Sequence, residues 1–97
     1  MTRRVVVSGD VFDDIDLQLP AERGPNGEPS ADDFIAQDLT AIVQLMAEQW
    51  DNLPPRFPGL KNIRVLIAPG HMVHAIVAVG MLLPDNTIEI VEVGIDR

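Results

Sequence analysis

The C-terminal third of the chain constrains the fold most, because three apolar runs rich in β-branched residues follow one another with almost no spacing. These runs are Ile63–Ala68, Met72–Leu83 and Thr87–Val93. Pro69-Gly70 separates the first two and Pro84-Asp85-Asn86 the last two, and both connections are too short for anything except an antiparallel turn. The sequence therefore predicts a three-stranded antiparallel meander.

The middle run is apolar at odd and even positions alike, and successive side chains of a strand point to opposite faces of a sheet. Both faces of the predicted sheet therefore need cover, while the chain supplies one strong helix. The set left uncovered is either Val73, Ala75, Val77 and Val79 or His74, Ile76 and Ala78. Because an exposed apolar patch is uncommon on a soluble monomer, we expect a protein partner or a second copy of the chain to cover this face.

A long amphipathic helix is predicted to begin at Ser30. The Ser30 hydroxyl can accept a hydrogen bond from a first-turn N–H, and Asp32 and Asp33 oppose the positive end of the helix dipole. Apolar residues then recur at helical spacing: Ile35, Leu39, Ile42, Val43, Met46 and Trp50. Pro54-Pro55 ends the helix at about Asn52, and residues 56–60 are expected to link it to the sheet.

The N-terminal part of the chain reads as mainly extended. The segment Arg3–Ser8 carries three consecutive valines and predicts a short first strand. Ile15, Leu17 and Leu19 alternate with polar residues, which predicts a half-buried extended segment, with an edge strand as one form of it. Glycine and proline between Ala21 and Pro29 predict a surface loop.

Ninety-seven residues, 46% hydrophobic and 23% charged, are typical of one globular domain, so we expect a single domain over residues 1–97. The predicted fold class is α+β, with a short N-terminal strand and one long amphipathic helix packed on the three-stranded meander. The absence of cysteine excludes disulfides and thiolate chemistry. No apolar run is long enough to span a membrane and Met1-Thr2-Arg3-Arg4 begins no signal peptide, so we expect a cytoplasmic protein without membrane contact.

The net charge of −8 repels phosphate backbones, so nucleic acid is a disfavoured partner. Much of the acid gathers near the N-terminus, at Asp10, Asp13, Asp14 and Asp16. This cluster superficially resembles a calcium loop but lacks the glycine and the glutamate of an EF-hand. We therefore interpret it as a solvated acidic edge that discourages strand pairing, and we expect neither a metal nor a cofactor.

His71 and His74 are the only histidines, and either could act as an acid or base near neutral pH. Their spacing puts them on opposite faces if both belong to one strand. If His71 lies in the Pro69-Gly70 turn, the two can approach each other. For a His74 inside an apolar strand, a structural role in the core or at an interface is favoured over catalysis.

The order of the expected elements adds a family resemblance. The passage Pro58–Ile67 leads to Gly70-His71-Met72-Val73-His74, and the chain closes on Ile90–Arg97. Over residues 30–97 this arrangement resembles the RelE/ParE toxin superfamily. The resemblance implies a RelE-like fold. It also implies basic residues at the entry of the middle strand and at the closing motif, which serve RNA cleavage in the ribosome-dependent branch, whereas the ParE branch poisons DNA gyrase.

Residue by residue, the Gly-Tyr-Arg-like entry of that family matches Gly70-His71-Met72, so methionine replaces the arginine. The closing motif matches Val93-Gly94-Ile95-Asp96, so isoleucine and aspartate replace its basic pair, and Arg97 follows one place later. Both changes remove charge that would hold a phosphate. The groups left for such a role are Lys61, Arg64, His71, His74 and Arg97.

Three functions remain open from the sequence. The first is protein–protein association on a toxin-like scaffold with degenerate catalytic positions, either as a member of a toxin–antitoxin system or as a self-associating accessory protein. The second is a divergent ribonuclease toxin that uses His71 or His74 with Arg64 and Arg97. The third is an acidic inhibitor of phage or mobile-element type that mimics nucleic acid through Asp10, Asp13, Asp14, Asp16, Asp32, Asp33 and Asp38.

Overall fold

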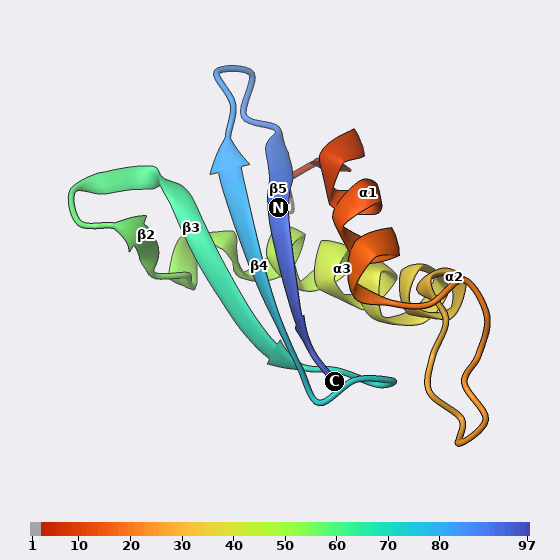
Figure 1. Cartoon of the computed structure of the whole chain (residues 1–97). Coiled ribbons are helices and arrows are strands. Elements are labelled where there is room, and N and C mark those ends of the chain that lie inside the picture. Colours follow the sequence, from red (N-terminus) through yellow and green to blue (C-terminus); the bar gives the residue numbers. More distant parts are fainter. Residues whose placement is uncertain (1–2) are drawn as a thin grey trace.

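The computed structural model describes residues 3–97 and shows a five-stranded mixed sheet with helices on one side (Figure 1). Met1 and Thr2, with which the expected single domain begins, lie outside the described residues. The strands are β1 (Val5–Val7), β2 (Pro55–Phe57), β3 (Leu60–Pro69), β4 (Ala75–Leu82) and β5 (Ile88–Asp96). Their order across the sheet is β1-β5-β4-β3-β2, in which β1 pairs parallel to β5 and the other neighbours are antiparallel. The α+β class is therefore as predicted.

The predicted meander forms only the centre of this sheet. Strands β3, β4 and β5 do follow one another antiparallel, but β1 and β2 extend the sheet on either side. β2 arises where the sequence predicted a plain link, because the chain turns tightly at Gly59, which has φ of +84°, and Phe57 pairs with Leu60. β4 also begins later than predicted, at Ala75, since residues 71–74 form a bend.

The predicted extended segment around Ile15 is wrong, because the structure has helix α1 there, from Gly9 to Gln18. Ile15, Leu17 and Leu19 alternate as in a strand, but Val11 and Ile15 are also four residues apart, as on one face of a helix. The structure follows the helical spacing, and both Val11 and Ile15 are fully buried. Leu17 points outward and is 86% exposed. The acidic residues of this region therefore lie on a helix and not on a strand edge.

The long helix predicted from Ser30 to about Asn52 is confirmed, with changes of pitch along its length. It comprises α2 (Ala31–Phe34), the π-helical segment η1 (Ile35–Leu39), α3 (Thr40–Gln49) and the 3₁₀ turn η2 (Trp50–Asn52). The Ser30 hydroxyl accepts the Asp33 N–H at 3.1 Å, and the Asp33 carboxylate accepts the Ser30 N–H at 3.2 Å. This reciprocal pair satisfies two backbone donors that an open helix end would leave without partners.

The helices cover one face of the sheet, with α1 beside β5 and α3 crossing behind the strands in Figure 1. The core between them includes Phe34, Ile42, Met46, Trp50, Ile76, Ile88 and Ile90. Gly80 allows the helix to approach closely, since a Cβ there would lie 3.0 Å from the Trp50 ring and 3.1 Å from Met46 Sδ. Among the helices of residues 3–97, none has the length and apolar character needed to cross a bilayer.

Candidate functional site

The face of the sheet turned away from the helices carries mainly apolar side chains, and we call it the open face. Its members alternate along each strand with the core residues and are Ile63, Val65, Ile67, Val77, Val79, Met81, Glu89, Glu92 and Gly94. Ile67 is 71% exposed and Val77 is 40% exposed. The structure divides the two sets that the sequence left open. Ile76 and Ala78 face the core, whereas Val77 and Val79 lie on the side of the open face, where Val79 is only 6% exposed. Val73 is buried in the core, and His74 is exposed in the β3–β4 turn.

A groove of about 480 Å³ crosses the open face. It is lined by Pro54, Pro55, Arg56, Val65, Val77, Val79, Glu92 and Gly94. Val65 and Val79 are cross-strand partners and form part of its floor, while Gly94, the partner of Val77, contributes no side chain. Filling this position would disturb little, because the nearest atoms to a Cβ at Gly94 are those of Val77 at 4.0 Å.

The two ends of the groove carry opposite charges. Arg56 belongs to the edge strand β2, and Glu92 belongs to β5, with β3 and β4 between them. Three strand spacings separate the two backbones, which amounts to about 14 Å. Both side chains are exposed, and the Arg56 guanidinium lies 4.8 Å from the centre of the Phe57 ring. The groove can therefore take an apolar surface that carries an anionic group at one end and a cationic group at the other.

Three of the four residues proposed for catalysis gather at one end of the sheet. His71 and His74 lie in the β3–β4 turn and are exposed. Of the two structural roles favoured for His74 from the sequence, in the core or at an interface, the core is therefore wrong. The His74 N–H donates to the Asp96 carbonyl oxygen at 2.8 Å, which places this turn beside Arg97, the residue after β5. Figure 1 shows the C-terminus next to the same turn.

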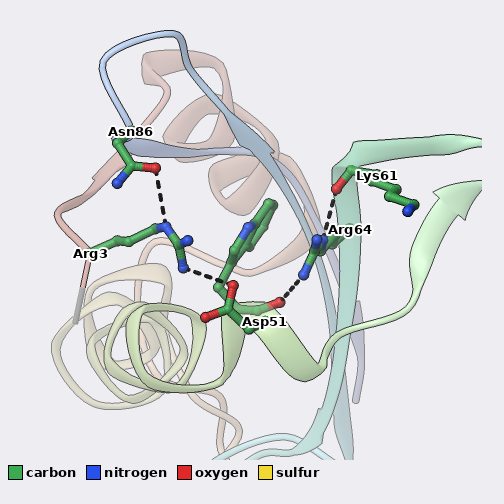
Figure 2. A network of polar contacts seen from close by, with 6 residues as sticks. Arg3, Asp51, Lys61, Arg64 and Asn86 are labelled. Carbon is green, nitrogen blue, oxygen red and sulfur yellow. Dashed lines mark hydrogen bonds and ion pairs between the residues drawn. The ribbon is translucent and has the colours of Figure 1, made fainter. Parts of the chain in front are cut away.

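Arg64 lies away from that end, on the helix side of the sheet. Its guanidinium donates to the Trp50 carbonyl oxygen at 2.6 Å and to the Lys61 carbonyl oxygen at 2.8 Å, and it lies 5.0 Å from the centre of the Trp50 ring (Figure 2). Arg64 pairs with Gly80 of β4, and Ala75, the first residue of β4, directly follows His74. At a strand rise of about 3.3 Å per residue, Gly80 lies roughly 17 Å along β4 from Ala75. The structure thus separates Arg64 from both histidines.

The contacts near Arg64 tie the end of the long helix to the sheet. Arg3 forms an ion pair with Asp51 at 3.0 Å and donates to the Asn86 side chain at 3.3 Å, as Figure 2 shows. Arg3 precedes β1, Asp51 lies in η2 and Asn86 lies in the β4–β5 turn. The guanidinium groups of Arg3 and Arg64 both have protein partners, so the arrangement is a joint between elements and supports no catalytic assignment. The buried Trp50 Nε1–H beside them has no hydrogen-bond partner among the described residues.

Asp38 is a buried carboxylate, although the acidic-inhibitor hypothesis counted it among the charges presented to a basic partner. It lies in η1, is 1% exposed, and accepts the backbone N–H groups of His71 at 2.5 Å and of Met72 at 2.9 Å. The π-helical turn coincides with the position from which this carboxylate reaches the β3–β4 turn. Asp38 therefore holds the start of the turn at His71 and Met72, and it cannot belong to an exposed acidic display.

Sequence reasoning named Asp38 only as part of an acidic display and did not single out Arg56 or Glu92. The signal available for Asp38 was its position next to Leu39, one of the apolar residues that recur at helical spacing. Arg56 and Glu92 are far apart in the chain, and only the register across β3 and β4 brings them to one groove. Among residues 3–97, no cluster of three or more histidine, aspartate or glutamate residues is arranged to hold a metal ion.

Comparison with models of protein families, with curated proteins and with solved structures finds no match to this chain. Function is therefore inferred from the geometry of the open face.

Proposed function

We propose that the chain is a binding domain that acts through protein–protein association at the open face. The observation that carries this proposal is the apolar groove between Arg56 and Glu92 on the side of the sheet that the helices leave uncovered. Water contact with Ile67 and Val77 is unfavourable by about 25 cal/mol for each Å² of apolar surface, and association removes it. A volume of about 480 Å³ suits a few large side chains of a partner.

A toxin-like scaffold remains part of this proposal. The long helix followed by the antiparallel strands β3 to β5 supports the RelE/ParE resemblance over residues 30–97. Both positions where that family carries cations are occupied otherwise here, by Met72 and Asp96. Association with a protein in the cytoplasm, as part of a toxin–antitoxin system or by self-association, is the function that such a degenerate scaffold keeps.

The ribonuclease alternative rests on a smaller group of residues than the sequence suggested. His71, His74 and Arg97 lie at one end of the sheet, whereas the Arg64 guanidinium is engaged by two backbone carbonyl oxygens near Trp50. Phosphate binding and acid–base catalysis need groups that converge on one substrate position. The separation of Arg64 therefore favours association over RNA cleavage.

A single charge placed on the groove floor tests the proposal. Gly94→Asp introduces a carboxylate between Val77 and Glu92, and the space around the new Cβ leaves the fold intact. Gly9→Asp is the matched control, because it makes the same change at the start of α1, where a Cβ meets nothing within 4 Å. Circular dichroism of both variants verifies that they fold.

Two assays measure association. In the first, the tagged chain is the bait in a lysate of the source organism, and quantitative mass spectrometry identifies the proteins that it retains. In the second, sedimentation of the purified chain measures self-association. We expect wild type and Gly9→Asp to behave alike, and Gly94→Asp to lose the associated protein, whether that is another protein or another copy. Association that is the same for Gly94→Asp, or no association in either assay, would contradict the proposal.

A further inference from the structure

We propose that the occupant of the open face is a second copy of this chain, packed face to face in a two-fold symmetric dimer. This inference rests on the proposed function, since it names the partner at the same surface. The two-fold axis runs along the strands, between β3 and β4, so that β3 of each copy lies over β4 of the other. A dimer of this kind buries the same patch on both chains.

The apolar part of the open face is self-complementary under that axis. Val65 and Ile67 of one copy face Val77 and Val79 of the second copy, because these residues are cross-strand partners within each chain. All four are β-branched, and side chains of this size fill the space between two sheets stacked about 10 Å apart. The packing covers Ile67, the most exposed of the four, together with Val77.

The charges of the groove are self-complementary under the same axis. Rotation about it brings Arg56 of each copy over β5 of the second copy, where the open face carries two acidic residues. Glu89 is level with Arg56 in the strand register, and Glu92 lies about 7 Å further along the strand. Two opposite-charge pairs then form at symmetric places. Opposite charges fix the register of an interface, whereas like charges facing each other oppose association.

Pairing through the exposed edge of β3 is less suited to a second copy than this packing of faces. β2 already occupies the edge of β3 up to Val65, whose N–H donates to the Pro54 carbonyl oxygen at 3.0 Å. Beyond it, Pro69 at the end of β3 has no N–H to donate. The stretch of edge between these two points is too short to hold a second copy by strand addition.

A charge swap tests the inference by sedimentation equilibrium of the purified chain. We expect wild type to be a reversible dimer. Arg56→Glu alone and Glu92→Arg alone each create two like-charge pairs and should raise the dimer dissociation constant about tenfold or more. The double variant restores opposite charges across the same axis, and its dissociation constant should return to within about twofold of wild type.

Glu48→Arg is the control, because Glu48 is an exposed residue of α3, on the helix side of the sheet, and its replacement should leave the dimer unchanged. A wild-type chain that stays monomeric at every concentration, or a double variant no better than the single ones, would overturn the dimer. If the chain is monomeric while a different protein from the lysate is lost with Gly94→Asp, the second copy is refuted and the proposed function stands. If neither assay detects association, both proposals fail.

Discussion

Replacement of Asp38 should destabilise the protein and loosen the turn that carries both histidines. In the wild type the N–H groups of His71 and Met72 each donate to one Asp38 carboxylate oxygen. In Asp38→Asn one of these oxygens becomes an NH₂ group, which cannot accept a hydrogen bond. One charge-assisted hydrogen bond is lost, which is worth about 1.5–3 kcal/mol, and a half-buried donor is left without an acceptor. Access of water to the exposed turn recovers part of this cost, so we expect a loss of about 2 kcal/mol.

Urea unfolding followed by circular dichroism measures this change. With a slope of roughly 1 kcal/mol per M for a small domain, the midpoint should fall by about 2 M. Glu48→Gln removes the same charge from an exposed position of the same helical segment and should leave the midpoint almost unchanged. Hydrogen exchange should also show faster exchange of the His71 and Met72 amides in Asp38→Asn. If both variants have the same midpoint and these amides keep their protection, Asp38 does not hold the turn.

Three further results are expected. Each copy carries a charge of −8, so the two copies repel each other, and salt screens this repulsion. Dimer affinity should therefore stay constant or rise as salt increases from about 0.01 to about 0.1 M, where the Debye length falls from about 30 to about 10 Å. Steep weakening of association by salt would instead favour an acidic mimic with a basic partner. Hydrogen bonds from Arg23 and from the Ser30 N–H lower the pKa of Asp33 below its usual 3.8, so its contribution to stability is present above that pH and is lost as pH falls. Asp33→Asn should therefore reduce the loss of stability on acidification, and an unchanged dependence of stability on acidic pH would contradict this. Gly80→Ala should lower stability in thermal unfolding by about 1–3 kcal/mol, because its Cβ meets the Trp50 ring at 3.0 Å, and a neutral result would mean that the ring can shift.

The long helix was predictable because independent local signals agree. Ser30 and Asp33 cap its start, apolar residues recur at helical spacing, and Pro54 limits its end. The central strands were predictable for a similar reason, since Pro69-Gly70 and residues 84–86 separate runs too apolar for loops. Local chemistry and tertiary packing point to the same structure in both cases.

Helix α1 and strand β2 were missed because their signals are weak or ambiguous. Ile15, Leu17 and Leu19 fit a strand pattern as well as a helix pattern, and only the packing of Val11 and Ile15 against the core decides between them. β2 has three residues and begins with a proline, so its pairing with β3 depends on the turn at Gly59.

The candidate site was predictable in part. The surplus of apolar side chains in the middle run predicted an uncovered face, and Val77 and Val79 do lie on it. Which of the two faces the helices cover depends on the register of β4 against β3, which sequence spacing does not set. The charged ends of the groove depend on four strands at once, so Arg56 and Glu92 could not be paired from the sequence.

Thiol protection on the open face tests the central claim most directly, since the chain contains no cysteine and one introduced thiol reports on one position. Val77→Cys places the thiol in the groove, and Leu17→Cys places it on the outer side of α1 as a reference. Alkylation rates are measured in dilute protein, in concentrated protein and in lysate. If the open face is a binding surface, alkylation of Val77→Cys slows severalfold in concentrated protein or in lysate, while that of Leu17→Cys stays constant. Equal rates for Val77→Cys under all three conditions would contradict the claim.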